Sequence, residues 1–326
     1  MSKMKLKTIA AVAAILLAGY ASATPTITDL SARQRYPWNG LVDISFTLSE
    51  RGYISVFATN AATGAVVPVR TLRDKAGNAD GGYTEFAPGN VHLVWDAGTD
   101  VPETLIETLS LSVVGAQPRG GVQLWAGGPY WAETNIGAEN PEDYGLYFWW
   151  GDTVGYRRKG NACWVASDGS SSNFSFSEGN APTYNKSKST LQSEGWITSA
   201  GVLAPEHDAA YVHWGGPWRI PTFWDLSNLD SKCDWTWTTR NGVNGYVVRG
   251  RGDFVASSIF LPAVGYGNGA SLHSAGSYGA YWSSCPIDND YNYAWSFYFG
   301  SNYHGTSFYD HRNYGLPVRP VQRFAQ

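Results

Sequence analysis

Apolar and polar residues alternate along the first third of the chain, from about residue 24 to residue 114. The segment VDISFTLS places Ile44, Phe46 and Leu48 on one side of an extended strand and polar residues on the other. The same alternation returns in YISVFAT, NVHLVWDA and TLSLSVVG, and polar turns such as DKAGNADGG separate these segments. The pattern predicts an all-β antiparallel sandwich in which one face of each sheet is buried.

The pattern changes in the second part of the chain. The segment GAQPRGG, residues 115–121, is rich in Gly and predicts a linker. Beyond it, short strand-like segments and long loops predominate, and helical signals are confined to STLQSEGWI and PTFWDLSNLDSKC. In the latter, Thr222 is a candidate N-cap of a helix that carries Leu226 and Leu229 on one side. Residues 122–326 therefore predict an α+β domain.

Residues 1–23 have the three parts of a secretory signal peptide. Three lysines make the beginning positive, the run from Ile9 to Ala18 is apolar, and Ala-Ser-Ala before Thr24 fits a cleavage site. The apolar run is shorter than the roughly 20 residues that a transmembrane helix needs. Tyr20 stands where a lipoprotein carries its lipidated Cys. We expect an exported protein without membrane insertion, located in the periplasm, on the cell surface or outside the cell.

Composition and charge narrow the range of partners. The chain has 15 Trp, 20 Tyr and 37 Gly among 326 residues, which is typical of turn-rich β proteins. Its net charge is −4, and without the three leader lysines 20 basic residues would face 27 acidic ones, giving −7. Basic clusters are lacking in the sequence, which argues against nucleic acid or anionic membranes as partners. Cys163, Cys233 and Cys285 allow one disulfide and one free thiol, and their spacing leaves the pairing open.

The C-terminal segment YWSSCPIDNDYNYAWSFYFGSNYHGTSFYDHRNYGLPVRPV is rich in Tyr, Asn, Asp, Ser and His and contains neither Lys nor Glu. A buried strand would hold more aliphatic residues, and a disordered tail would hold fewer aromatic ones. Within AWSFYFG, alternation predicts that Trp295, Phe297 and Phe299 face the core, whereas Ser296 and Tyr298 are displayed.

This composition matches that of an antibody paratope. Tyr offers a large contact area with a polar end, and the small polar residues offer adaptable hydrogen bonds. We therefore predict a ligand-contact surface, and we expect no catalytic residues, no metal and no cofactor. The predicted ligand-binding residues are Asp288, Asn289, Asp290, Tyr291, Asn292, Tyr293, Ser296, Tyr298, Asn302, Tyr303, His304, Tyr309, Asp310, His311 and Asn313.

Six blocks in the second part follow the order found in the Fibrobacter major paralogous (FISUMP) domain family, which the chain resembles over about residues 121–321. They are GVQLWAGGPYWAETNIGAENPEDYGLYFWWGDTVGY, WGGPWRIPT, CDWTWTTRNGVNGYVV, SIFLPAVGYGNGASL, GSYGAYWSS and GLPVRPV. The resemblance implies a C-type-lectin-like fold, shared with formylglycine-generating enzymes and phage tropism determinants, in which long loops present a ligand surface. Some family members carry Cys where this chain has Thr134 and Ala263, so no disulfide pairing carries over. GNVHLVWDAGTD similarly resembles a strand of bacterial immunoglobulin-like modules, which implies a spacer or presentation role for residues 24–114.

The resemblance also suggests an origin for the C-terminal composition. Phage tropism determinants are diversified by retroelements that mutate adenines and convert Asn codons into Tyr, Asp, Ser or His codons. The segment from Pro286 to Tyr314 is rich in these residues, and an unaltered-looking VRPV follows it. Ordinary divergence of loops among tandem paralogues would give the same composition, so both origins stay open.

Other motifs indicate structural roles. The RGD tripeptide at residues 251–253 follows a strand-like NGYVV and predicts a charged turn. His207, Asp208 and His213 lack the spacing of a helical zinc pair, so we expect capping or packing. The alternating oxygen ligands of DNDYN (residues 288–292) could open a calcium loop, but the Gly and Glu that such a loop needs are lacking.

We expect a secreted or surface-displayed, non-enzymatic protein for recognition or adhesion, with a protein or glycan ligand outside the cell. A carbohydrate-binding or matrix protein is the alternative. A degenerate formylglycine-generating type of enzyme is less favoured, because Cys233 and Cys285 do not fall in that family's copper motif, and no Ser-His-Asp order comes with a supporting Gly motif.

Overall fold

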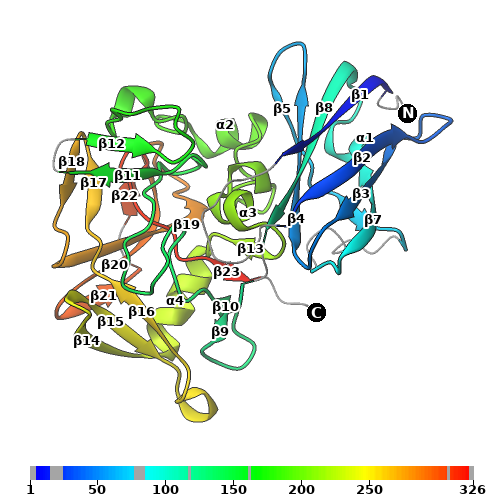
Figure 1. Ribbon diagram of the computed structural model, residues 1–326. Coiled ribbons are helices and arrows are strands. Elements are labelled where there is room, and N and C mark those ends of the chain that lie inside the picture. Colours follow the sequence, from blue (N-terminus) through cyan, green and yellow to red (C-terminus); the bar gives the residue numbers. More distant parts are fainter. Residues whose placement is uncertain are drawn as a thin grey trace. The chain divides into compact units, whose positions relative to one another are not determined.

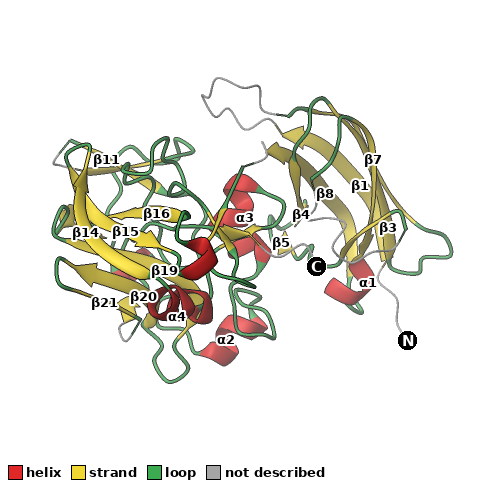
Figure 2. Cartoon of the chain, turned by 90° about the horizontal axis from the view of Figure 1, so that it is seen from below, coloured by secondary structure: helices red, strands yellow, loops and turns green. Residues whose placement is uncertain are grey.

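The computed structural model describes residues 5–14, 25–76, 85–116, 119–160, 163–306 and 309–322. These parts of the chain are mostly β structure, with short helices and long loops between the strands (Figures 1 and 2). The chain divides into two compact units, Met1–Pro118 with Tyr211–Pro217, and Arg119–Ala210 with Trp218–Phe324. The first boundary falls within the segment that the sequence predicts as a linker. The assignment of residues 211–217 to the first unit has no counterpart in the sequence pattern.

The first unit is built from two four-stranded sheets. One has the order β1-β8-β4-β5, with β1 Lys5–Ala14, β8 Leu105–Ala116, β4 Tyr53–Asn60 and β5 Val66–Val67. The other has the order β2-β3-β7-β6, with β2 Ile27–Gln34, β3 Leu41–Leu48, β7 Gly89–Asp96 and β6 Leu72–Asp74. A short helix, α1 Ala97–Asp100, follows β7. Pairing is antiparallel except between β1 and β8, which run parallel.

One hydrophobic core joins both sheets of this unit, and β3 shows how the sequence specifies it. Ile44, Phe46 and Leu48 are at most 2% exposed, and the residues between them are half-buried. Hydrophobic alternation therefore predicted the buried face of β3 correctly. The residues Lys5–Ala14, which the sequence predicts to be part of a signal peptide, form β1, and Ile9 packs against the same core.

The second unit contains several small antiparallel sheets. One has the order β13-β23-β10-β9, with β13 Trp218–Arg219, β23 Val321–Gln322, β10 Tyr130–Trp131 and β9 Val122–Gln123. The hairpins are β11 Tyr156–Lys159 with β12 Cys163–Ala166, and β17 Tyr266–Asn268 with β18 Ser271–His273. A three-stranded sheet comprises β14 Asp234–Arg240, β15 Val243–Arg249 and β16 Ser258–Pro262. The C-terminal sheet comprises β19 Tyr278–Pro286, β20 Tyr293–Gly300, β21 Tyr303–Gly305 and β22 Tyr309–His311, and both of the last two pair with β20.

Two short α-helices accompany these sheets, α2 Lys188–Ser193 and α4 Phe223–Lys232. A third, α3 Ala209–Trp214, begins in the second unit and lies mostly in the segment 211–217 that is grouped with the first. Single 3₁₀ turns lie at Glu178–Asn180, Pro205–His207 and Gly252–Phe254. The helix predicted from Thr222 onwards is confirmed as α4. The Thr222 hydroxyl accepts the Asp225 N–H at 3.2 Å, and the Asp225 carboxylate accepts the Thr222 N–H at 2.8 Å, so the two residues form a capping box. Leu226 and Leu229 are buried beneath it.

The core of the second unit is rich in aromatic residues and holds two fully buried arginines among the described residues, Arg312 and Arg319. Arg319, within the terminal VRPV, donates to the Asn135 Oδ1 atom at 2.8 Å and to the carbonyls of Ala132 and Glu133. Burial lowers the pKa of Arg319 to about 10. The VRPV segment is thus an internal anchor of the fold. None of the helices in the described parts of the chain combines the length and the hydropathy that a transmembrane helix requires.

Candidate ligand-contact surface

The C-terminal strands hold most of the predicted ligand-binding residues on one sheet. β20 is the central strand, with β19 on one side and β21 and β22 on the other. Helix α4 packs against β19, β20 and β21 (Figure 2). Phe297 and Phe299 on β20 are fully buried, as alternation predicted. Phe297 and Phe299 therefore fix β20 in the core, and the loops on either side of the strand are attached to it.

The predicted residues fall into three classes of exposure. The exposed residues are Asp288, Asn289, Tyr291, Asn302, Tyr303 and Tyr309. The half-buried residues are Asp290, Asn292, Tyr293, Tyr298, His304, Asp310 and His311. Ser296 and Asn313 are buried. Tyr291, Tyr303 and Tyr309 are each about half exposed, at 52%, 48% and 49%, so they are large aromatic side chains available for contact.

Three predictions about individual residues are wrong. Ser296 is only 1% exposed, because both faces of β20 are covered at this position, and alternation does not report on the second face. Asn313 is 4% exposed, since its carbonyl accepts the indole N–H of Trp149 at 3.0 Å inside the core. Trp295 is half-buried rather than part of the core, and its ring lies 4.5 Å from that of Phe223.

A chain of aromatic contacts links α4 to the C-terminal strands and to the β17–β18 hairpin. We call this set of eight residues the aromatic row. Each ring centroid lies between 4.1 and 6.5 Å from the next in the order Trp224, Phe223, Trp295, Tyr309, Tyr293, His311, Tyr314 and Tyr266. Trp224 at one end is 71% exposed. The row joins three predicted residues to five that the ligand prediction did not include.

Sequence alone could have identified Trp224. It lies one position after Phe223 in a helix whose buried residues are Leu226 and Leu229, so it is out of phase with the buried side. The helical spacing thus places a large aromatic side chain on the exposed side of α4, where it is 71% exposed. The remaining members come together through strand pairing, which the local pattern does not specify.

Polar contacts fix several side chains around the aromatic row. The hydroxyl of Tyr293 lies 2.8 Å from the Nε2 atom of His311, and burial lowers the pKa of His311. The Nδ1 atom of His304 lies 2.6 Å from a carboxylate oxygen of Asp230 on α4, and the Trp235 ring stacks on the imidazole. These contacts fix the orientations of the rings, and side chains that are already fixed lose less conformational entropy in any further contact.

Buried Arg312 anchors the loop that precedes β20. Its guanidinium donates to the carbonyls of Tyr293 at 2.8 Å, Lys186 at 2.9 Å, Thr183 at 3.1 Å and Asp290 at 3.3 Å. Burial lowers the pKa of Arg312 to about 10. The sequence analysis did not single out this residue, although an Arg within a segment otherwise free of basic residues could have drawn attention to it.

Several buried polar atoms in the same segment have no hydrogen-bond partner within the described structure. They are Asn292 Oδ1, His311 Nδ1 and Asn313 Oδ1. Burial raises the pKa of the Asp310 carboxyl, an effect that the nearby Ser296 hydroxyl partly opposes. Buried polar groups without a partner cost stability.

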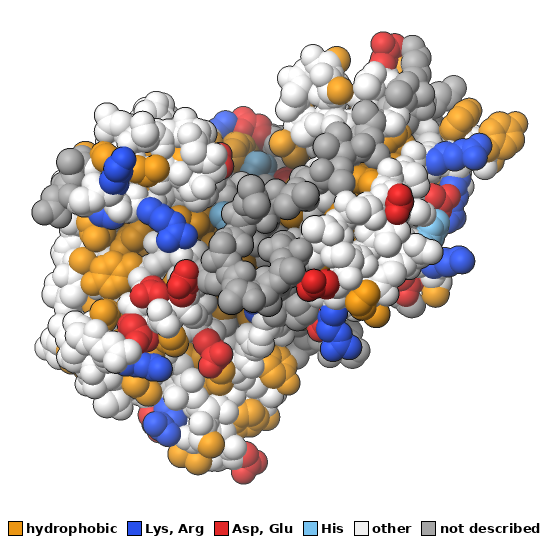
Figure 3. Space-filling view, viewed as in Figure 1, with side chains coloured by type: hydrophobic (Ala, Val, Ile, Leu, Met, Phe, Trp, Pro, Cys, Tyr) orange, Lys and Arg blue, Asp and Glu red, His pale blue; other side chains and the backbone are white. Residues whose placement is uncertain are grey.

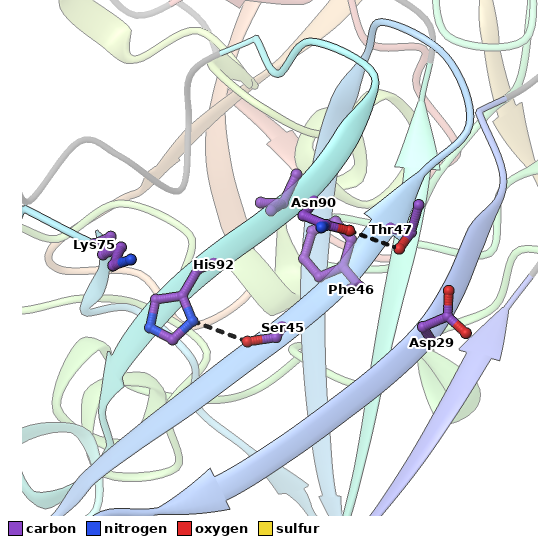
Figure 4. Close-up of a pocket in the computed structure, with 8 residues that line it drawn as sticks. Asp29, Ser45, Phe46, Thr47, Lys75, Asn90 and His92 are labelled. Atoms are coloured by element: carbon purple, nitrogen blue, oxygen red, sulfur yellow. Dashed lines mark hydrogen bonds between the residues drawn. The ribbon is translucent and has the colours of Figure 1, made fainter.

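A separate polar pocket of about 530 Å³ lies on the first unit, over β3 and β7 (Figure 4). Its lining includes Ser45 and His92, which face each other across the strands with 2.9 Å between Oγ and Nδ1. The Nε2 atom of His92 lies 3.2 Å from Asp43, whose pKa is lowered chiefly by the hydrogen bond from Arg35. The fold thus brings together a Ser-His-Asp set that the sequence order did not reveal.

Among the described residues, the Ser45–His92–Asp43 set has no oxyanion-binding N–H groups beside it, which an acyl-transfer site also needs. Ser45 lies in the middle of a strand between β2 and β7, not at a sharp turn or a helix N-terminus where free N–H groups could bind an oxyanion. Arg35 also holds Asp43 through Nε and NH2, at 2.9 and 2.7 Å. The arrangement is a cross-strand polar network on the outer face of the sheet.

The other motifs take structural roles. Arg251 of the RGD tripeptide donates to Asp234 and to the carbonyls of Ser231 and Cys233, at or just beyond the C-terminal end of α4. Asp208 accepts the N–H groups of Ala210 and Ile220, as its predicted capping role requires. All three cysteines are free thiols, so the disulfide that their number allows is not formed. Among the described residues, no cluster of three or more His, Cys, Asp and Glu side chains could hold a metal ion.

Comparison with known proteins gives one match. The model of a family described as a domain of unknown function (DUF8237) matches residues 220–321. This range begins just before α4 and includes all eight residues of the aromatic row. No curated protein and no solved structure matches the chain.

Proposed function

We propose that the chain is an exported recognition protein that binds a protein or glycan outside the cell membrane through the C-terminal sheet of its second unit. The observation that carries the proposal is the aromatic row, with exposed Trp224 and Tyr309, set on a sheet that Phe297 and Phe299 hold in the core. Large aromatic side chains on a rigid base are what contact hot spots require. Tyr291 in the loop before β20 and Tyr303 on β21 are exposed as well.

The architecture proposed with this function is an immunoglobulin-like first unit and a C-type-lectin-like second unit. The immunoglobulin-like assignment of the first unit is supported by its two four-stranded β-sheets around one core. Small antiparallel sheets with a few short helices and long connecting loops support the C-type-lectin-like assignment of the second. In this arrangement the first unit presents the second, and diversification by a retroelement would act on loops that lie on the binding surface.

We include the absence of enzymatic activity in the proposal. Burial raises the pKa of the Cys233 thiol to about 11, which disfavours the thiolate that copper coordination needs. The Ser45 set lacks an oxyanion site, as described above. On the face shown in Figure 3, basic side chains are scattered among acidic ones, which supports a partner other than nucleic acid.

The carbohydrate alternative is favoured by the length of the aromatic row. Successive ring centroids lie within 6.5 Å of one another, so the row is long enough to offer an extended glycan several aromatic contacts. In this case Asn, Asp and His around the row would bind the sugar hydroxyls.

Glycan arrays and pull-down from surface proteins, both with the secreted protein, separate the two classes of ligand. Variants Trp224→Ala and Tyr309→Ala should lower ligand affinity at least tenfold. Tyr130→Ala is the matched control, because Tyr130 is 40% exposed in the same unit but lies outside the aromatic row. Equal binding by all three variants would refute the proposed surface. A near-repeat of the coding 3′ end beside a reverse-transcriptase gene would support diversification.

A further inference from the structure

Strand β8 carries β1 on its outer edge. Nine residue pairs, from Lys5 opposite Leu105 to Ala14 opposite Val114, join the two strands in parallel (Figure 1). On its other side β8 pairs with β4. The order β1-β8-β4-β5 therefore makes β1 the edge strand and covers the long β8.

All of β1 lies within the predicted signal peptide. This inference rests on the proposed export, because cleavage before Thr24 would remove β1 together with the leader. The backbone N–H and C=O groups of β8 that face β1 would then lose their partners. The next strand, β2, pairs with β3 in the other sheet.

Without β1, the exposed edge of β8 would have few features that prevent it from pairing with a strand of another chain. Natural edge strands are commonly shielded by Lys, Pro, bulges or short length. The sequence of β8, LIETLSLSVVGA, is twelve residues long and contains neither Lys nor Pro, and Glu107 is its single charged residue. Its register with β4 runs from Tyr53–Ala116 to Asn60–Leu109 without a bulge.

We infer that β8 of the mature protein accepts an extended strand of another exported protein by parallel β-strand addition. The register of β1 indicates what such a strand contains. It places Ile9 beside Leu109, and Ala11 and Ala13 beside Leu111 and Val113. These three β8 residues are fully buried in the core.

The donor strand therefore needs a bulky apolar residue followed, at alternate positions, by two small ones. Ile9 packs against the core from the first of these positions. The intervening β8 positions, Thr108, Ser110 and Ser112, are half-buried and tolerate small or polar neighbours. A second copy is a poorer occupant, since two β8 edges paired about a twofold axis would bring large residues together where β1 offers Ala.

The test uses the secreted protein, with its N-terminus sequenced, and the labelled peptide KLKTIAAVAA, which corresponds to residues 5–14. Fluorescence anisotropy should show saturable binding. A peptide with Ala11→Pro should bind at least tenfold more weakly, because Pro lacks the N–H that a ladder needs. Ala11→Trp should weaken binding similarly by overfilling the position beside Leu111. The unexported full chain, whose edge β1 already occupies, should not bind the peptide.

Each outcome supports or overturns the inference. A secreted protein that starts at Thr24 but does not bind the peptide, or binds the Pro peptide equally well, overturns strand addition and leaves export intact. A secreted protein that retains residues 1–23 overturns both, because β1 then stays in place. A dimer that the peptide dissociates would show that a second copy occupies the edge, and would overturn the assignment to another protein.

Discussion

The guanidinium carbon of Arg312 lies 5.1 Å from the centre of the Trp150 ring, and both side chains are fully buried. The indole N–H of Trp150 donates to the carbonyl of Ser283 at 2.8 Å, so the ring itself is fixed to β19. The flat cation is therefore placed between an aromatic face and the carbonyls of two chain segments, 183–186 and 290–293. This geometry suits Arg and does not suit Lys.

Replacing Arg312 by Met should destabilise the second unit by at least about 3 kcal/mol, because several buried carbonyls would lose their partner. Arg312→Lys should recover little of this loss, since one ammonium group cannot reach all of the oxygens. Urea unfolding followed by tryptophan fluorescence measures both. Arg157→Met is the control, because Arg157 is exposed in the same unit. Equal stability of the Met and Arg proteins would contradict an anchoring role.

Truncation should separate the core of β20 from its displayed neighbours. Phe297→Ala and Phe299→Ala should each cost about 3–5 kcal/mol, as expected for fully buried aromatic residues. Tyr291→Ala and Tyr303→Ala should change stability by no more than about 0.5 kcal/mol, since both side chains are half exposed. Trp295→Ala should fall between the two pairs. Thermal melts decide this without knowledge of the ligand, and a large loss at Tyr291 would place that residue in the core.

Asp310 should make stability depend on pH. Its folded-state pKa is raised by burial, so protonation favours the folded state, and this contribution fades as the pH rises through that pKa. Asp310→Asn should therefore raise the melting temperature at pH 7, and the difference from the parent protein should disappear in acid. Asp288→Asn serves as the exposed control. A lower melting temperature for Asp310→Asn at pH 7 would mean that a contact stabilises the ionised carboxylate.

The thiols should differ in reactivity. Burial raises the pKa of Cys233 to about 11, whereas Cys163 and Cys285 are half-buried. Iodoacetamide at pH 8 should alkylate Cys163 and Cys285 well before Cys233, as followed by mass spectrometry of the native protein. A reductant should leave the melting temperature unchanged, because no thiol is paired. A loss of stability on reduction would reveal a disulfide.

The sequence predicted those structural elements that are specified by residues close together in the chain. Alternation identified the buried face of β3, and Thr222 as a candidate N-cap marked the beginning of α4. Alternation failed for Ser296, because its burial depends on what covers the second face of β20. Likewise, Ser45 and His92 are 47 positions apart in the chain, and only the β3–β7 register makes them neighbours. Arg312 acts through carbonyls of distant segments, a relationship that residue types do not reveal.

The bonds of Arg312 to the chain have an evolutionary consequence. Every oxygen that it binds belongs to the main chain, including those of Asp290 and Tyr293. A main-chain oxygen is present whichever residue occupies a position, so substitution at 290 or 293 leaves the bond available. The loop before β20 can therefore change side chains at these two positions while its backbone keeps its bonds to the same cation. If the surface binds a ligand as proposed, selection could change that ligand while the hydrogen bonds from Arg312 to the loop's main chain persist.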